Sequence, residues 1–193
     1  MTSCRRYLLL FLLGLLAGPT FIILHELRHY AVASALGGTP TLHSRLTTCA
    51  TPSRMGPHGK LLVILAGPAG DALMGGVGLL WLYLLRRHRR EAAPTLVEWL
   101  ATTLALSAAR WLRGFGGLPS HPQPGDEVLL SQAMGMPNWF LPYLLAPLCV
   151  IPLIAVIRLH PPGARLAPFA ALILGGLVGR QLWILAAGPC LLP

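Results

Sequence analysis

The sequence is poor in charged side chains and especially poor in acids. Charged residues make up 11% of its 193 positions, and only 6 of them are Asp or Glu, whereas 54% are hydrophobic. The mean hydropathy is +0.64. A soluble domain carries more charge on its surface, so the composition excludes that class and predicts an integral membrane protein.

Cysteines are also few, and they are scattered along the sequence. No two stand in a C-x-x-C spacing. That pattern suggests neither a cysteine zinc site nor a disulfide framework. The four positions are Cys4, Cys49, Cys149 and Cys190.

The formal charge of +9 comes from 15 Lys and Arg against the 6 acids. In a soluble protein such an excess would raise the question of nucleic acid. Here no aromatic-interleaved basic face is present, and the arginines stand mainly beside apolar runs. We therefore expect no nucleic-acid partner and interpret the charge as anchoring and orientation in a lipid bilayer.

Long apolar runs dominate what remains. A helix that spans a membrane needs about 20 mostly apolar residues. Five stretches meet that criterion, and they predict an all-α bundle of about five transmembrane helices forming a single domain, residues 1–193. The expected spans are 7–36, 60–85, 94–112, 138–159 and 166–187.

The segments between these runs are rich in residues that break helices. Gly18-Pro19 offers a kink in the first span, and Gly37-Gly38 is a strong stop signal. Residues 37–59 predict a loop with a short β-hairpin, and residues 113–137 predict a loop with one helical turn after Asp126.

The arginines also indicate orientation. Counting Lys and Arg in the short loops places the N-terminus in the cytoplasm of a multi-pass protein, with a bacterial inner membrane as the expected location. The cytoplasmic side then holds Arg5, Arg6, the cluster Arg86–Arg90, Arg158 and Arg165.

Ile23–Val32, ILHELRHYAV, places ionisable groups directly after an apolar run. The motif H-E-x-x-H on a helix sets His25 and His29 one turn apart, where both imidazoles reach one metal ion. Glu26 is the expected general base, acting on water without binding the metal. Nitrogen and carboxylate ligands with one open position favour zinc, one ion per chain.

The third ligand is sought among the few acids. Asp126 is the favoured candidate and Asp71 the main alternative, with His121 and Glu127 also possible. Each acid has a structural interpretation as well: Asp71 as a buried acid bonded to a neighbouring helix, and Asp126 as a helix N-cap.

At these residues the sequence resembles the site-two proteases, which are membrane-embedded zinc metalloproteases. HELRHYAVASALGG is similar to their H-E-x-G-H-x-x-x-A-x-x-x-G-G segment, with Arg28 in place of a glycine. LAGPAGDALMG resembles their A-G-P-x-x-N segment, with Asp71 in place of an asparagine. The resemblance implies a substrate-binding role for Gly67, Pro68 and Asp71.

A third segment, PGDEVLLSQAMGMP, is similar to the D-G-x-x-x-x-x-x-x-G segment of this family. It implies Asp126 as the third metal ligand, with Glu127 where glycine is usual. The resemblance further implies cleavage of a peptide bond in or near a transmembrane segment of a client membrane protein. It also implies a site toward the cytosol, whereas the arginine count favours the opposite side.

Two other functions remain open. Arg28, Asp71 and Glu127 depart from the family pattern near the expected site, so a non-catalytic membrane scaffold with the same fold is one alternative. A metal-ion transporter is the other, because histidines and acids within spans can form an ion path. The oligomeric state and the identity of the client stay open.

Overall fold

A computed structural model describes residues 3–44, 46–49, 55–108 and 125–192. Within them, helices account for nearly all regular structure, and the only strands form one small hairpin. The helices are α1 (Ser3–Ala35), α2 (Gly56–Arg86), α3 (Leu96–Ala105), α5 (Asp126–Ala133), α6 (Phe140–Leu159), α7 (Leu166–Leu182) and α8 (Gly188–Leu191).

Four helices of the described part are long and apolar enough to cross a membrane. They agree with four of the five expected spans to within a few residues at most ends, and the last one includes a short π-helical segment, Trp183–Ala187, that joins α7 to α8. The four are Cys4–Ala35, Gly56–Arg86, Phe140–Leu159 and Pro162–Leu191.

The expected span 94–112 has a different form. Its described part contains α3, which has an N-terminal capping box between Thr95 and Glu98 and continues as a helical segment to Ala108. Positions 109–112 lie outside the described residues. The segment Leu96–Ala108 extends about 20 Å, less than an apolar bilayer core of about 30 Å, so the expected span stays a prediction. Within α3, Thr102 and Thr103 are buried, whereas Leu96, Val97 and Leu100 are exposed.

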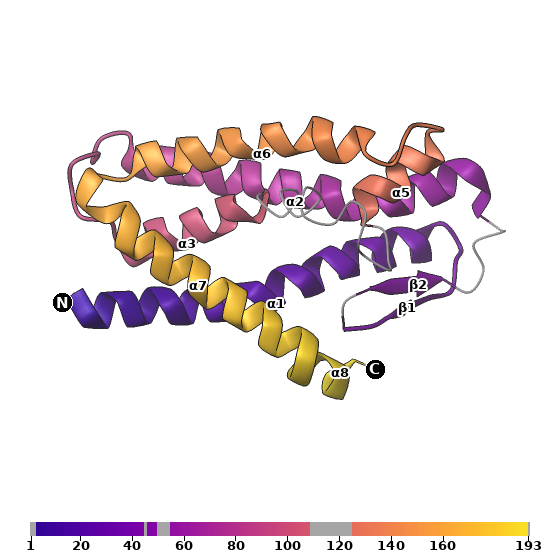
Figure 1. The fold of residues 1–193 in the computed structure, drawn as a ribbon, viewed down its shortest axis with the longest axis horizontal. Helices are drawn as coiled ribbons and strands as arrows, with labels where there is room; N and C mark the ends of the chain where they lie inside the picture. Colours follow the sequence, from indigo (N-terminus) through magenta and orange to yellow (C-terminus); the bar gives the residue numbers. More distant parts are fainter. Residues whose placement is uncertain (1–2, 45, 50–54, 109–124, 193) are drawn as a thin grey trace.

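The long first helix contains Pro19 and stays continuous from Ser3 to Ala35. It changes direction part-way along its length (Figure 1). A proline lacks the amide proton for one helical hydrogen bond, which allows such a bend. The helix ends as expected, because Gly37 has a φ of +77°, a conformation that favours glycine.

Glycines join α1 and α7 in close contact. A β-carbon built on Gly175 would lie 2.0 Å from the carbonyl oxygen of Phe11, and one on Gly179 would lie 2.0 Å from that of Leu15. On α1, a β-carbon on Gly14 or Gly18 would also meet the backbone of α7, at 2.1 Å and 2.6 Å. Small residues of this kind let helix backbones approach within van der Waals distance, as in membrane helix pairs. In Figure 1, α7 crosses α1 while α6 runs along α2.

The predicted hairpin follows α1. Strands β1 (Pro40–Leu42) and β2 (Thr47–Cys49) are antiparallel, with Thr41 opposite Thr48. The hydroxyl of Thr47 donates a hydrogen bond of 2.9 Å to the backbone carbonyl of Glu26. The hairpin is therefore tied to the part of α1 that carries the H-E-x-x-H motif.

Candidate metal centre

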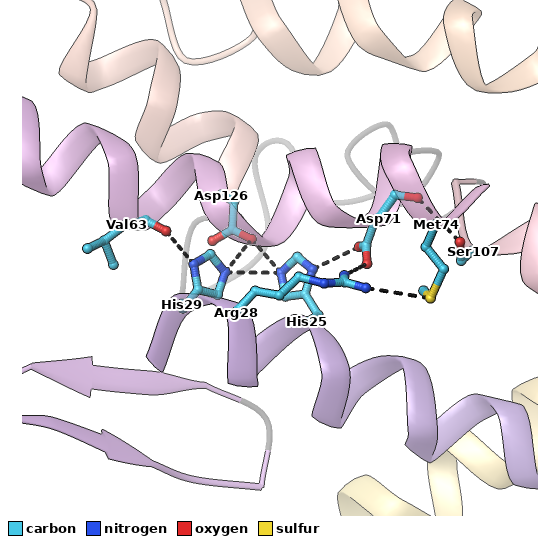
Figure 2. A network of polar contacts seen from close by, with 8 residues as sticks. All are labelled: His25, Arg28, His29, Val63, Asp71, Met74, Ser107 and Asp126. Carbon is cyan, nitrogen blue, oxygen red and sulfur yellow. Dashed lines mark hydrogen bonds and ion pairs between the residues drawn. The ribbon is translucent and has the colours of Figure 1, made fainter. Parts of the chain in front are cut away.

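Two histidines of α1 and one aspartate of α5 bring their donor atoms together (Figure 2). Nε2 of His25 lies 2.7 Å from Oδ2 of Asp126, and Nε2 of His29 lies 3.3 Å from the same oxygen. The two Nε2 atoms are 3.2 Å apart. Both histidines are buried, and Asp126, the first residue of α5, is partly buried.

These three separations suit a metal ion. Tetrahedral ligands at about 2.0 Å from zinc stand about 3.3 Å from one another. Lone pairs of nitrogen and oxygen at such distances repel unless a cation, either a proton or a metal ion, lies between them. The donor set and its spacing therefore fit a metal ion held by His25, His29 and Asp126.

The far side of each imidazole has a hydrogen-bond acceptor. Nδ1 of His25 lies 2.8 Å from Oδ2 of Asp71, and Nδ1 of His29 lies 2.6 Å from the carbonyl oxygen of Val63. An acceptor at Nδ1 holds the proton there and leaves the Nε2 lone pair free to point inward. Metal-binding histidines are usually oriented in this way by a carboxylate or carbonyl.

Because Gly67 of α2 has no side chain, the two imidazoles fit against this helix. A β-carbon built there would lie 2.4 Å from Nε2 of His29 and 2.7 Å from Nε2 of His25. These distances are too short for any side chain. The second helix therefore packs its backbone against the two ligands, and the expected substrate-binding role of Gly67 stays a prediction beside this packing role.

Asp71 lies behind His25 and is not in the converging group. It is completely buried, and while Oδ2 faces His25, Oδ1 accepts a hydrogen bond of 2.6 Å from Nη1 of Arg28 (Figure 2). Of the two acids weighed as third ligand, the structure thus brings Asp126 to the histidines and leaves Asp71 as a partner of one of them. Its role in substrate binding, like that of Pro68, which is buried in α2, stays a prediction.

Arg28 occupies the position where the resembled family has glycine. Its Nη2 lies 3.5 Å from the sulfur of Met74, and its side chain passes over Gly70. A β-carbon on Gly70 would lie 2.1 Å from Cδ of Arg28. The arginine is thus accommodated between α1 and α2 and paired with Asp71.

The remaining candidates are placed as follows. Glu26 is buried and is not among the side chains whose donor atoms converge, and its role as the base stays a prediction. Glu127, the next residue after Asp126, is partly buried and also outside the group. His121 lies outside the described residues.

The charge of Asp126 is favoured by its neighbours. Burial raises the pKa of this carboxyl group, but the hydrogen bonds and charges of His25 and His29 outweigh burial and hold the pKa well below its ordinary value. Asp126 is therefore an ionised carboxylate at neutral pH, the form that binds a metal ion.

Comparisons with protein families, with curated proteins and with solved structures found no match. The geometry of the site is therefore the main basis for assigning a function.

The structure agrees with the interpretation of Asp71 as a buried acid bonded to a neighbouring helix, with His25 and Arg28 of α1 as its partners. Sequence reasoning missed two features of this centre, the carbonyl of Val63 behind His29 and the contact of Gly67 with both imidazoles. A backbone carbonyl leaves no trace in a sequence. The small residues of LAGPAG are the one signal of close packing, because glycines at this spacing permit two helices to approach.

Proposed function

We propose that this protein is an intramembrane zinc metalloprotease that hydrolyses a peptide bond in or near a transmembrane segment of a client membrane protein. The observation that carries the proposal is the convergence of His25, His29 and Asp126, in which the aspartate stands 101 positions after the first histidine. An H-E-x-x-H helix joined by one carboxylate is the ligand set of hydrolytic zinc sites.

Each residue of the site has a different role in the proposed hydrolysis. A bound zinc ion would supply Lewis-acid activation of a water molecule and of the scissile carbonyl. Glu26 takes a proton from that water and passes it to the nitrogen of the leaving amine. Asp71 and the Val63 carbonyl hold the ligand imidazoles in orientation, and Asp126 supplies the negative charge of the ligand set.

The surroundings of the site support a membrane substrate. His25 and His29 belong to an apolar helix long enough to span a bilayer, and they stand 10 and 6 residues before its end at Ala35. The site then lies about 10 to 15 Å along the helix from that end, inside the apolar part. A helical substrate hides its carbonyls in hydrogen bonds, so the client must unwind locally before hydrolysis.

Metal content tests the ligand set. Detergent-purified protein, reconstituted with zinc, is measured by elemental analysis as wild type, His25→Ala and Asp126→Asn. About one zinc per chain is expected in the wild type, with loss in both variants. His58→Ala is the matched control, because it removes an exposed imidazole at the start of α2 and should keep the metal.

Cleavage tests the reaction. Tagged single-span membrane proteins are reconstituted with the protease in liposomes, and the products are identified by mass spectrometry. Glu26→Gln should keep zinc and lose at least about 100-fold in cleavage rate, because a general base contributes that much. Unchanged cleavage in this variant would refute the mechanism.

The same measurements separate the alternatives. A well-folded protein that binds no zinc would favour the non-catalytic scaffold. Zinc uptake into liposomes that survives Glu26→Gln would favour the transporter.

A further inference from the structure

A second site lies between α2 and α6, apart from the metal centre. It is an open groove of about 540 Å³, and no metal-centre residue lines it. Its apolar part is formed by Leu79 and Leu80 of α2 and by Ala155 of α6. Gly76 continues this lining, and a β-carbon built on it would meet no atom within 4 Å. The missing side chain leaves that stretch of the groove open.

One end of the groove is cationic. Arg90, shortly after the end of α2, and Arg158, near the end of α6, both line it, and both are exposed. Tyr83 of α2 also lines the groove. In the sequence it lies between Leu80 and Arg90. Along α2 the lining runs from Gly76 to Tyr83, about 10 Å, and Arg90 follows beyond the end of the helix, so the groove is elongated, with charge at one end.

These two arginines have no carboxylate partner within the described part of the chain. The ion pairs of arginine found there join Arg28 to Asp71 and Arg86 to Glu98. The other acid near this end, Glu91, lines a neighbouring hollow together with Arg87, His88 and Arg89 as well as Arg90. The end of the groove therefore carries uncompensated positive charge.

We propose that this groove binds one anionic phospholipid. An acyl chain lies along Gly76 and Leu79, and the phosphate is held by Arg90 and Arg158. A ligand with an apolar chain and an anionic head complements both parts of the groove, and basic pockets between membrane helices bind such headgroups. The headgroup of a zwitterionic lipid carries a positive charge, which the arginines would repel. Free phosphate could bind the arginines but would make no contact with the apolar part. This site is independent of the proposed protease activity.

The test uses the purified full-length chain in detergent, titrated with lipid and followed by native mass spectrometry. Phosphatidylglycerol is compared with phosphatidylcholine of the same acyl chains and with inorganic phosphate. One phosphatidylglycerol per chain is expected, bound at least tenfold more tightly than phosphatidylcholine, with no saturable binding of phosphate. Equal affinity for the two lipids, or phosphate bound as tightly as phosphatidylglycerol, would overturn the proposal.

Two pairs of variants locate the site. The double variant Arg90→Gln and Arg158→Gln should bind phosphatidylglycerol about 30-fold more weakly. Each basic residue near a membrane surface contributes about a fivefold gain in affinity for anionic lipid. Arg87→Gln with Arg89→Gln removes the same charge outside the groove and should change binding far less. Equal losses in the two pairs would show general charge attraction and refute a specific groove.

The apolar part has its own test. Gly76→Phe places a ring in open space within the groove and should abolish the preference for phosphatidylglycerol, while Ala170→Phe adds the same ring at an exposed position of α7 and should leave it unchanged. Unaltered binding in Gly76→Phe would overturn the proposal. Zinc content should be the same in all of these variants, so failure of the lipid site and failure of the metal site are distinguishable.

Discussion

A single buried side chain, Asp71, serves two partners on α1. One of its oxygens faces Nδ1 of His25 and the other accepts from Arg28. The arginine and the aspartate are both departures from the resembled family, and the structure makes them one interacting pair. The positive charge of Arg28 stabilises the buried carboxylate of Asp71 beside His25.

Removing the Asp71 charge should weaken metal binding without removing a ligand. In Asp71→Asn, the His25 imidazole loses its carboxylate acceptor, and partners of this kind contribute about 10- to 100-fold to metal affinity. Zinc affinity measured by competition with a chromophoric chelator should fall by that amount, while saturating zinc still gives one ion per chain. Glu91→Gln, an exposed acid at the far end of α2, should have no effect. Unchanged affinity in Asp71→Asn would contradict the orienting role.

The pairing of Arg28 with Asp71 should appear as energetic coupling. Arg28→Gln removes the arginine partner of a buried carboxylate and should destabilise the fold by about 3 kcal/mol, the low end for a broken buried pair. The arginine side chain is 25% exposed, so solvent screening reduces the effect. Combining it with Asp71→Asn should cost less than the sum of the single changes, by about 1 kcal/mol or more. Unfolding in mixed micelles measures all three variants, and strictly additive losses would exclude the pair.

At this scale the sequence predicts which side chains converge better than it predicts the contacts behind them. The spacing of His25 and His29 follows from helix geometry, and the resemblance singled out Asp126. The contacts of Asp71 and Val63 depend on how α2 is rotated against α1, which no local pattern specifies. Glu26 as the base stays a prediction until the reaction is measured.

Among the elements, α2 has glycines with three different environments. Gly67 and Gly70 face the side chains of α1, Gly75 and Gly78 face α3, and Gly76 is open. A single helix thus packs closely on two sides and leaves a groove on a third. Its 31 residues connect the metal centre to the opposite, arginine-rich end of the molecule.

Two alanine substitutions in this helix should have opposite effects. Gly67→Ala places a β-carbon against both imidazoles, so zinc should be lost or bound much more weakly, although the helix itself favours alanine. Gly76→Ala meets no atom and should keep the metal and raise stability by up to about 1 kcal/mol. Elemental analysis and thermal unfolding compare the pair. Normal zinc content in Gly67→Ala would contradict the packing of α2 against the ligands.

Apolar run length predicted four long helices well, and the run at 94–112 is described only as far as Ala108. Four runs gave helices of spanning length because a membrane helix is defined by length and hydropathy, both of which are local properties. The run at 94–112 is also apolar, but Glu98 and Thr102 lie within it and are buried against other helices. A buried core helix and a membrane span look alike until the partners of such polar residues are known.

Across the whole molecule, buried polar groups lie at both ends of the bundle. Away from the metal centre, Arg86 is completely buried and donates to the carbonyls of Leu159 and Ala92, with Glu98 3.5 Å away. These bonds tie the end of α2 to α6 and to the start of α3. Next to them, the His160 ring stacks on Trp99, with ring centroids 4.6 Å apart.

Acid should destabilise the fold through His160. Burial and the nearby charge of Arg86 lower the pKa of this imidazole to about 4 from an ordinary 6.5. The unfolded chain therefore binds a proton between these values that the folded chain does not, so stability is full above pH 6.5 and falls as the pH drops toward 4. The loss approaches about 3 kcal/mol at pH 4, at 1.36 kcal/mol per pKa unit.

Thermal unfolding in detergent between pH 7 and pH 4 measures this dependence. His160→Phe keeps an aromatic ring against Trp99 but cannot titrate, although it loses the contact of Nε2 with Thr102 at 2.8 Å. This variant should be less stable than the wild type at neutral pH. Its stability should nevertheless change less with pH over this range than that of the wild type. An identical slope in the two proteins would show that other groups cause the acid sensitivity.

The distance along the chain between His25 and Asp126 also determines how long a growing chain contains the histidines without Asp126. The ribosome adds about 5 to 20 residues per second, so the 101 positions between them take about 5 to 20 seconds to synthesise. During that time the motif helix exists without Asp126 beside it. A chain interrupted before α5 would contain the whole H-E-x-x-H sequence and still lack the third member of the proposed ligand set.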